Sequence, residues 1–312
     1  MIKMDKYKKS HRWTILLFML LTAVALLVSS CTKADKPAEN LPPVDDEPAP
    51  VDVRVVPEMP VGGQEIIETK PVDMKPAENP DLVVTIPDRN LEIVIRTEIG
   101  KPDGPITAGD MAQIIDLSAP NSGIQTLDSI EYCVNLLGLN MASGQEEDAV
   151  QNFISDLKPI AGLVSLERLS LQGNRINDLA PLKNLISLRA VNLSDNGLED
   201  ISTLGNLINL EDLLLINNKV GDISSLENCR VLKNLWVQHN EITDIGSLRG
   251  LENLEKVFID SNLIRDLAPL VENPGIGDKD QVFVTLNPLT EDAVNIQLKV
   301  LRDRGVFVSY AE

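Results

Sequence analysis

The chain has few of the residues that enzymes most often use for chemistry. It contains 2 histidines, His11 and His239, and aromatic residues make up only 3% of its 312 residues. A zinc site built from several histidines is therefore excluded, and a Ser-His-Asp triad would have to rely on His239. The sequence contains no Walker-type or dinucleotide-binding glycine loop. These absences predict a protein that is not an enzyme and binds no metal or cofactor, and in which His239 contacts solvent or a partner.

The N-terminus has the three-part layout of an export signal. Basic residues up to Arg12 precede an uninterrupted apolar run, Trp13–Val28, and two small residues, Ser29 and Ser30, follow before Cys31. Signal peptides combine these features. A transmembrane helix is the alternative, but about 16 apolar residues are fewer than the roughly 20 that a span requires. Residues 1–30 are therefore predicted to be a signal peptide.

The position of Cys31 resembles the lipobox of bacterial lipoproteins. In that family this cysteine becomes the lipidated first residue of the mature protein, and the residue before it is usually Ala or Gly, where this chain has Ser30. The resemblance implies a lipoprotein that carries fatty acids such as palmitate on Cys31. It also implies attachment to a cell membrane or outer membrane from the extracytoplasmic side.

Residues 31–80 are rich in proline and acidic residues. Ten of the 19 prolines lie between Pro37 and Pro80. Such a stretch has little to bury and is predicted to be a disordered tether, with one candidate strand over residues 51–56. Removing residues 1–30, which hold five basic residues and one acidic residue, leaves 23 basic and 46 acidic residues and a net charge of −23. This charge argues against nucleic acid and anionic lipid head groups, and it suits a basic partner or solubility outside the cell.

A 22-residue repeat fills most of the remaining chain. Its pattern is L-x-x-L-x-L-x-x-N-x-[LIV]-x-D-[LI]-x-x-L, and five consecutive units begin at Leu163, Leu185, Leu207, Cys229 and Leu251. Internal repeats of this length indicate a solenoid. The pattern resembles the bacterial 22-residue leucine-rich repeat. The resemblance implies an α/β solenoid, a horseshoe with a parallel β-sheet on its concave face.

Two polar columns recur within the repeat. The asparagine column is Asn174, Asn196, Asn218, Asn240 and Asn262, and the aspartate column is Asp156, Asp178, Asp200, Asp222, Asp244 and Asp266. An inward amide can bond to backbone groups of adjacent turns that water cannot reach. Each aspartate is predicted to cap the turn that follows it through backbone N–H groups. A carboxylate ladder that holds calcium is the alternative.

Less regular units extend the array over residues 111–289, which gives about 8 units, with an eight-residue insertion around residues 144–151. A helix after Asp88 and a capping box at Thr107–Asp110 predict a helical N-terminal cap over residues 81–110. A helix over residues 290–304 and a strand over residues 306–310 predict a C-terminal cap over residues 290–312.

The arrangement resembles the repeat domains of internalin-like bacterial surface proteins over about residues 82–310. The sequence departs from that family because no immunoglobulin-like extension and no wall-sorting motif follow the repeats. Host-cell adhesion is therefore not implied by the fold alone.

Cys133 and Cys229 occupy the apolar position that begins a unit. They lie four repeats apart, or about 19 Å at roughly 4.8 Å per strand. A disulfide requires Cα atoms within about 7 Å, so both thiols are predicted to be free and buried.

The residue between the two core positions of each strand is predicted to face the concave side. This central column reads Asn140, Ser170, Asn192, Leu214, Trp236, Phe258 and Phe283. Contiguous exposed apolar side chains with a polar rim are typical of binding sites, where tryptophan is a frequent anchor. The predicted ligand-binding residues are Leu214, Ile216, Trp236, Phe258, Phe283, Gln238, His239 and Asp260. Chance, or a C-terminal segment folded over the face, is the alternative explanation of the row.

Three functions are compatible with this pattern to different degrees. The first is a lipid-anchored, extracytoplasmic recognition or adhesion module that binds a protein or peptide on the concave face. The second is a structural envelope protein whose copies associate through the same patch. The third, a glycan hydrolase, would need paired carboxylates in a pocket, which an open horseshoe does not favour.

Overall fold

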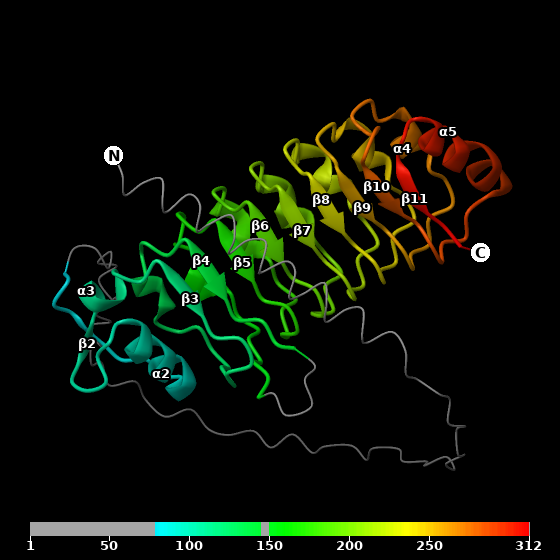
Figure 1. The fold of residues 1–312 in the computed structure, drawn as a ribbon. Helices are drawn as coiled ribbons and strands as arrows, with labels where there is room; N and C mark the ends of the chain where they lie inside the picture. Colours follow the sequence, from blue (N-terminus) through cyan, green and yellow to red (C-terminus); the bar gives the residue numbers. More distant parts are fainter. Residues whose placement is uncertain (1–78, 145–149, 312) are drawn as a thin grey trace, which may run out of the picture. The chain divides into compact units, whose positions relative to one another are not determined.

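The computed structural model describes residues 79–144 and 150–311 (Figure 1). These residues belong to one compact unit, Thr69–Glu312. The predicted signal peptide, the lipidation site at Cys31, the tether with its candidate strand and the middle of the insertion lie outside the described residues. Within the described part of the chain, no helix is both long enough and apolar enough to cross a membrane.

Nine parallel strands form one sheet, and each strand lies beside the next one in the sequence. They are β3 (Asp116–Ser118), β4 (Gly138–Asn140), β5 (Arg168–Ser170), β6 (Ala190–Asn192), β7 (Asp212–Leu214), β8 (Asn234–Trp236), β9 (Lys256–Phe258), β10 (Gln281–Phe283) and β11 (Phe307–Ser309). Equivalent positions of the repeat pair across the sheet, so that Leu213 lies between Val191 and Leu235. The repeat therefore sets the register, and the predicted solenoid is confirmed.

Short helical turns lie on the opposite side of the solenoid. They are η3 (Ile130–Tyr132), η4 (Lys158–Ile160), η5 (Ala180–Asn184), η6 (Ser202–Asn206), η7 (Ser224–Asn228), η8 (Gly246–Gly250) and α4 (Ala268–Glu272). The carboxylate of Asp222 accepts the Ser224 N–H at 2.7 Å at the start of η7. The same bond forms at Asp156, Asp178, Asp200, Asp244 and Asp266. The predicted capping role of the aspartate column is confirmed.

Leucine side chains and the asparagine column fill the space between the sheet and the turns. Leu213 and Leu215 are fully buried. The Asn218 side chain donates to the carbonyl groups of Leu193 and Leu215, at 3.1 and 2.9 Å. Its Oδ1 atom accepts the N–H of Leu198 at 2.9 Å. One amide thus satisfies backbone groups of two consecutive repeats, as predicted for this column.

Both cysteines of the repeats are free and buried, as predicted. Burial raises the pKa of Cys133 to about 12 and that of Cys229 to about 11. Both therefore stay protonated thiols at neutral pH and are poor nucleophiles.

Two helices and a small ribbon precede the first strand of the large sheet. They are α2 (Arg89–Glu98), α3 (Ala108–Met111) and the antiparallel pair β1 (Val83–Val84) and β2 (Ile106–Thr107). The Asp88 carboxylate accepts the N–H groups of Asn90 and Leu91 and so begins α2 as predicted. Its second oxygen accepts the N–H of Gln125 at 2.7 Å, which joins the helix to the repeats.

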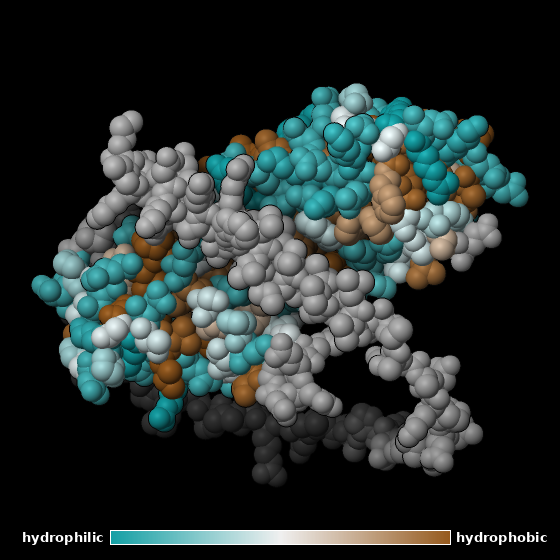
Figure 2. Space-filling model, viewed as in Figure 1, coloured by the Kyte–Doolittle hydropathy of each residue, from teal (hydrophilic) through white to brown (hydrophobic). Residues whose placement is uncertain are grey.

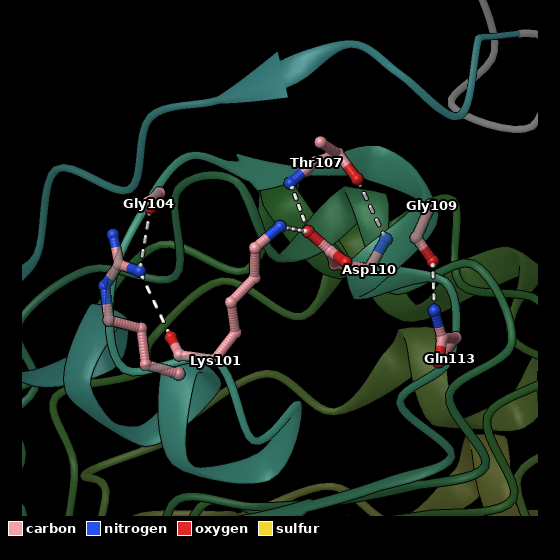
Figure 3. Close-up of polar contacts among 7 residues, drawn as sticks. Lys101, Gly104, Thr107, Gly109, Asp110 and Gln113 are labelled. Carbon is pink, nitrogen blue, oxygen red and sulfur yellow. Dashed lines mark hydrogen bonds and ion pairs between the residues drawn. The ribbon is translucent and has the colours of Figure 1, made fainter.

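The predicted capping box begins α3. The Thr107 N–H donates to the Asp110 carboxylate at 2.9 Å, and the Asp110 N–H donates to the Thr107 hydroxyl at 3.2 Å. Figure 3 shows the two residues facing each other. The Lys101 ammonium group lies 2.7 Å from the same carboxylate. Hydrogen bonds from Lys101 and Thr107 hold the pKa of Asp110 below its ordinary value.

The C-terminal helix consists of a π-helical turn, η9 (Ala293–Gln297), followed by α5 (Leu298–Asp303). The sequence predicts the helix but not its π turn. Gln297 joins this helix to the last repeat, because its Nε2 donates to Asp266 at 2.6 Å and its Oε1 accepts the Leu267 N–H at 2.7 Å. Figure 2 shows that hydrophilic residues cover most of the visible surface over the C-terminal repeats.

Candidate binding face

Leu214, Trp236, Phe258 and Phe283 lie side by side on four neighbouring strands. Each pairs with the next in the sheet register. The Trp236 and Phe258 rings meet edge to face with centroids 5.8 Å apart, and the Phe258 and Phe283 rings are tilted with centroids 4.3 Å apart. All four side chains are half-buried, whereas Leu213 is fully buried. These four residues of the central column therefore face away from the core, as predicted.

Phe307 extends this row, although it is not among the residues predicted to bind a ligand. Its ring centroid lies 5.7 Å from that of Phe283, and its side chain is 59% exposed. Phe307 pairs with Gln281, which lies two residues before Phe283. It therefore belongs to the column formed by the first residue of each strand, which is called the flanking column below. The predicted strand over residues 306–310 contained the signal, but its register with β10 was not known. Leu214, Trp236, Phe258, Phe283 and Phe307 are called the aromatic row below.

The prediction that the Ile216 side chain is exposed and contacts a ligand is wrong, because this side chain is only 3% exposed. The Ile216 N–H donates to the Ser194 hydroxyl at 3.1 Å, and the Asn217 N–H donates to the Gln238 carbonyl at 3.0 Å. Ile216 thus lies between Ser194 and Gln238. Strands about 4.8 Å apart allow side chains of one column to cover each other. Alternation along a strand predicts the face of a residue but not this lateral cover.

Three polar candidates lie at the strand ends beside the aromatic row. Gln238 is half-buried, and its Oε1 atom is buried without a hydrogen-bond partner. Asp260 accepts the Thr285 N–H at 3.0 Å, and burial raises the pKa of its carboxyl group. His239 is exposed, and its backbone N–H donates to the Asp260 backbone carbonyl at 3.1 Å. The structure brings these residues together, and their role in binding a ligand stays a prediction.

Left-handed backbone conformations recur directly after these strands. The residues and their φ angles are Asp195 (58°), Asn217 (55°), His239 (55°), Ser261 (53°) and Leu286 (57°). Aspartate and asparagine tolerate this conformation, whereas it is unusual for a bulky apolar residue. Leu286 nevertheless adopts it. This side chain lies three residues beyond Phe283 and is 67% exposed. Strained backbone of this kind concentrates at functional sites.

Asp212 and Asn234 flank the row on its other side. The Asn234 Nδ2 group donates to the Asp212 carboxylate at 2.6 Å, and this bond fixes the orientation of the amide. The Oδ1 atom of Asn234 is then buried without a partner. Burial raises the pKa of Asp212. The sequence did not single out either residue, because spacing does not show which polar atoms lack a partner.

The N-terminal half of the same face is polar and internally hydrogen-bonded. Gln172 donates through Nε2 to Asp195 at 3.0 Å and accepts through Oε1 from Asn192 at 3.3 Å. Asn217 donates to the same Asp195 carboxylate at 2.8 Å. These side chains satisfy one another, so this half of the face has less need of a ligand than the half that carries the aromatic row.

Comparisons with known proteins agree with this architecture. A family model described as leucine-rich repeats in two copies matches residues 230–272. The crystal structure of internalin C2 from Listeria monocytogenes is 28% identical with a TM-score of 0.64, and the match covers 72% of this chain and 94% of that one. The internalin InlF from the same organism is 26% identical with a TM-score of 0.63, covering 73% of this chain and 65% of that one. No curated protein matches the sequence. The described residues therefore form a leucine-rich repeat solenoid similar to these internalins.

Proposed function

We propose that this protein is a recognition module that binds a protein or peptide through the aromatic row. The observation that carries the proposal is the contiguity of the row, in which four aromatic rings follow one another with centroids 4.3 to 5.8 Å apart. Aromatic residues make up only 3% of the chain, so their concentration on one face favours a function there. Exposed apolar patches with a polar rim mark interaction sites, and tryptophan often anchors them.

Binding rather than catalysis also fits the chemistry of the face. Aromatic rings, side-chain amides and partly buried carboxylates line the concave face, and His239 is the one histidine among the described residues. The thiols of Cys133 and Cys229 are buried in the core and protonated, so they supply no nucleophile to this face.

The proposal includes an extracytoplasmic location with a lipid on Cys31. Its support is the order of basic residues, apolar run, small residues and cysteine at the N-terminus. Residues 31–80 would then act as a tether between the membrane and the repeats. Metabolic labelling of the full chain with a palmitate analogue tests this part, and Cys31→Ser should abolish the label.

A second candidate function is association of copies through the same surface. One observation favours it: β11 is the last strand of the sheet, and Phe307 on it is 59% exposed. Contiguous exposed apolar surface marks protein–protein interaction sites, so the exposed end of the row suits a second copy. Light scattering at increasing concentration separates the candidates, because a chain that stays monomeric contradicts association.

Selection of displayed random peptides on the full chain tests the first proposal. We expect peptides that bind the native chain and lose about tenfold or more in affinity when Trp236→Ser and Phe258→Ser are combined, since aromatic anchors carry much of the energy of such contacts. The matched control combines Ile186→Ser and Ile208→Ser, two side chains that are 51% and 54% exposed outside the row. Equal loss in both double variants, or no selected peptide, would contradict the proposal.

A further inference from the structure

We infer that the aromatic row takes a cationic ligand: a peptide segment in which a lysine or arginine side chain lies beside an apolar residue. This inference rests on the proposed function and names the chemistry of the partner. It follows from the polar atoms around Trp236, from the charges that flank the row and from the edge-to-face geometry of the Trp236 and Phe258 rings.

Two side chains on and just after strand β8 each carry an acceptor oxygen that receives no hydrogen bond. Asn234, Trp236 and Gln238 point to the same face because side chains alternate along a strand. On either side of Trp236, one amide oxygen, Asn234 Oδ1 or Gln238 Oε1, is buried without a partner. The bond from Asn234 Nδ2 to Asp212, at 2.6 Å, keeps the Asn234 oxygen from exchanging places with its nitrogen. Lysine and arginine side chains offer several donors and no acceptor, so they complement such oxygens.

The flanking charges favour a cation as well. Asp212 lies beside Asn234 in the flanking column. Asp260 occupies the position of Gln238 one repeat later, two residues after the central column. Lys256 pairs with Asn234 across the sheet. It is the basic residue of the flanking column that lies next to the aromatic row. The nearby Lys233 is held by Glu211, with 2.7 Å between the ammonium nitrogen and a carboxylate oxygen. Carboxylates thus outnumber unpaired cations here, in a chain with a net charge of −19.

The rings can hold a cation too. The edge-to-face contact of Trp236 with Phe258 occupies the face of only one of the two rings, with an interplanar angle of 87°. Within the described residues, the cation–π pair is Arg175 over Phe153 at 4.4 Å, away from the row. Tryptophan binds cations best among the aromatic side chains. Trp236 with its two flanking oxygens therefore suits a guanidinium or ammonium group that packs on a ring and donates at its edge.

The peptide selection on the full chain tests the inference through the composition of the selected peptides. We expect an excess of lysine and arginine over the unselected library, next to apolar residues. The most enriched peptide is then synthesised with each arginine replaced by citrulline and each lysine by acetyl-lysine, which removes the charge and keeps the length. We expect at least one replacement to weaken binding about tenfold in calorimetry.

Variants of the protein identify the contact. Asp260→Asn and Gln238→Leu should each weaken the enriched peptide about fivefold to tenfold. Glu227→Gln is the control, because Glu227 is an exposed carboxylate in η7, outside the sheet, and the variant removes the same charge as Asp260→Asn. We expect no measurable change for it. Equal effects of Asp260→Asn and Glu227→Gln would show only a general attraction to an acidic chain and would overturn the inference.

The outcomes separate the inference from the proposed function. Peptides that depend on Trp236 and Phe258 but carry no excess of basic residues overturn the cationic ligand and leave the recognition module standing. Peptides whose binding ignores the Trp236→Ser and Phe258→Ser changes, or the absence of any binder, overturn both. Thermal unfolding of each variant, with a melting temperature well above the temperature of the binding assay, assures that a lost contact rather than a lost fold explains weaker binding.

Discussion

The two halves of the concave face share one repeat but use their polar atoms differently. Gln172 and Gln238 occupy the same column, three repeats apart. Both amide atoms of Gln172 are hydrogen-bonded, to Asp195 and Asn192. The Oε1 atom of Gln238 is buried without a partner. The same residue in the same backbone position is thus part of a closed network in one half and an unsatisfied acceptor in the other.

The central column differs in the same direction. Asn192 is 4% exposed and bonds to its own strand end, because its Oδ1 accepts the Ser194 N–H at 3.1 Å. Trp236, its counterpart two repeats later, is half-buried and packs on Phe258. Backbone and core are alike in both halves, so the difference lies in the outward side chains alone. The scaffold is uniform, and the surface on it is specialised.

The largest expected effect separates core from face within one strand. Leu213→Asn places an amide among apolar side chains, leaves a cavity and should lower the free energy of unfolding by about 4 kcal/mol or more. Leu214→Asn gives β7 the residue that β6 carries at Asn192 and should change stability by less than about 1 kcal/mol. Urea unfolding of the full-length variants measures both. Similar losses would show that the two columns are not distinct.

The second prediction uses the two glutamines, and the expected effects have opposite signs. Gln172→Leu breaks two hydrogen bonds and leaves the Asn192 amide and the Asp195 carboxylate short of a partner, so it should destabilise by about 1 kcal/mol. Gln238→Leu removes an acceptor that is already unsatisfied and should stabilise by up to about 1 kcal/mol. Thermal unfolding of both variants checks the signs. A stability gain at Gln238 together with weaker peptide binding would show an acceptor kept for function.

Much of the fold can be predicted from the sequence because the repeat encodes local rules that act again in each turn. Leucines fix the inner face of the strands, and each aspartate caps the turn two residues later, as Asp222 does for Ser224. The asparagine column supplies the bonds that Asn218 makes to Leu193 and Leu198. These interactions depend on spacing within one repeat or between neighbours, which a single sequence contains.

The candidate site is only partly predictable, because lateral contacts decide it. The alternation of side chains along a strand correctly predicts that Trp236 and Phe258 are accessible. It also predicts an accessible Ile216, which is only 3% exposed because it lies between the neighbouring residues of the same repeat position. Phe307 joined the row only once the pairing of β11 with β10 was known. The unsatisfied oxygen of Asn234 depends on where its own amide nitrogen bonds. Contacts of this kind follow from three-dimensional placement, and residue spacing does not contain them.

The third prediction concerns pH and compares the two faces of the solenoid. Burial raises the pKa of Asp212 above its ordinary value of 3.8, whereas a hydrogen bond from the Ser224 N–H lowers the pKa of Asp222. Folded Asp212 therefore holds its proton more tightly than the unfolded chain does, so stability is lost as pH rises through the raised pKa. Asp222 behaves oppositely, since its contribution is present above the unfolded pKa and is lost as pH falls through the lowered folded one.

Asn variants at the two positions should reveal these opposite slopes in melting temperature measured from about pH 3 to pH 7. Relative to the native chain, Asp212→Asn should gain stability as pH rises, and Asp222→Asn should lose it. The gain at Asp212 should stay below about 1 kcal/mol, because the Asn234 amide and the nearby Lys233 and Lys256 offset part of the cost of burial. Slopes of the same sign would mean that the Asp212 carboxylate on the concave face is better solvated than its contacts imply. It would then hold a cation less firmly beside Trp236, because a hydrated carboxylate attracts a charged ligand more weakly than a buried one.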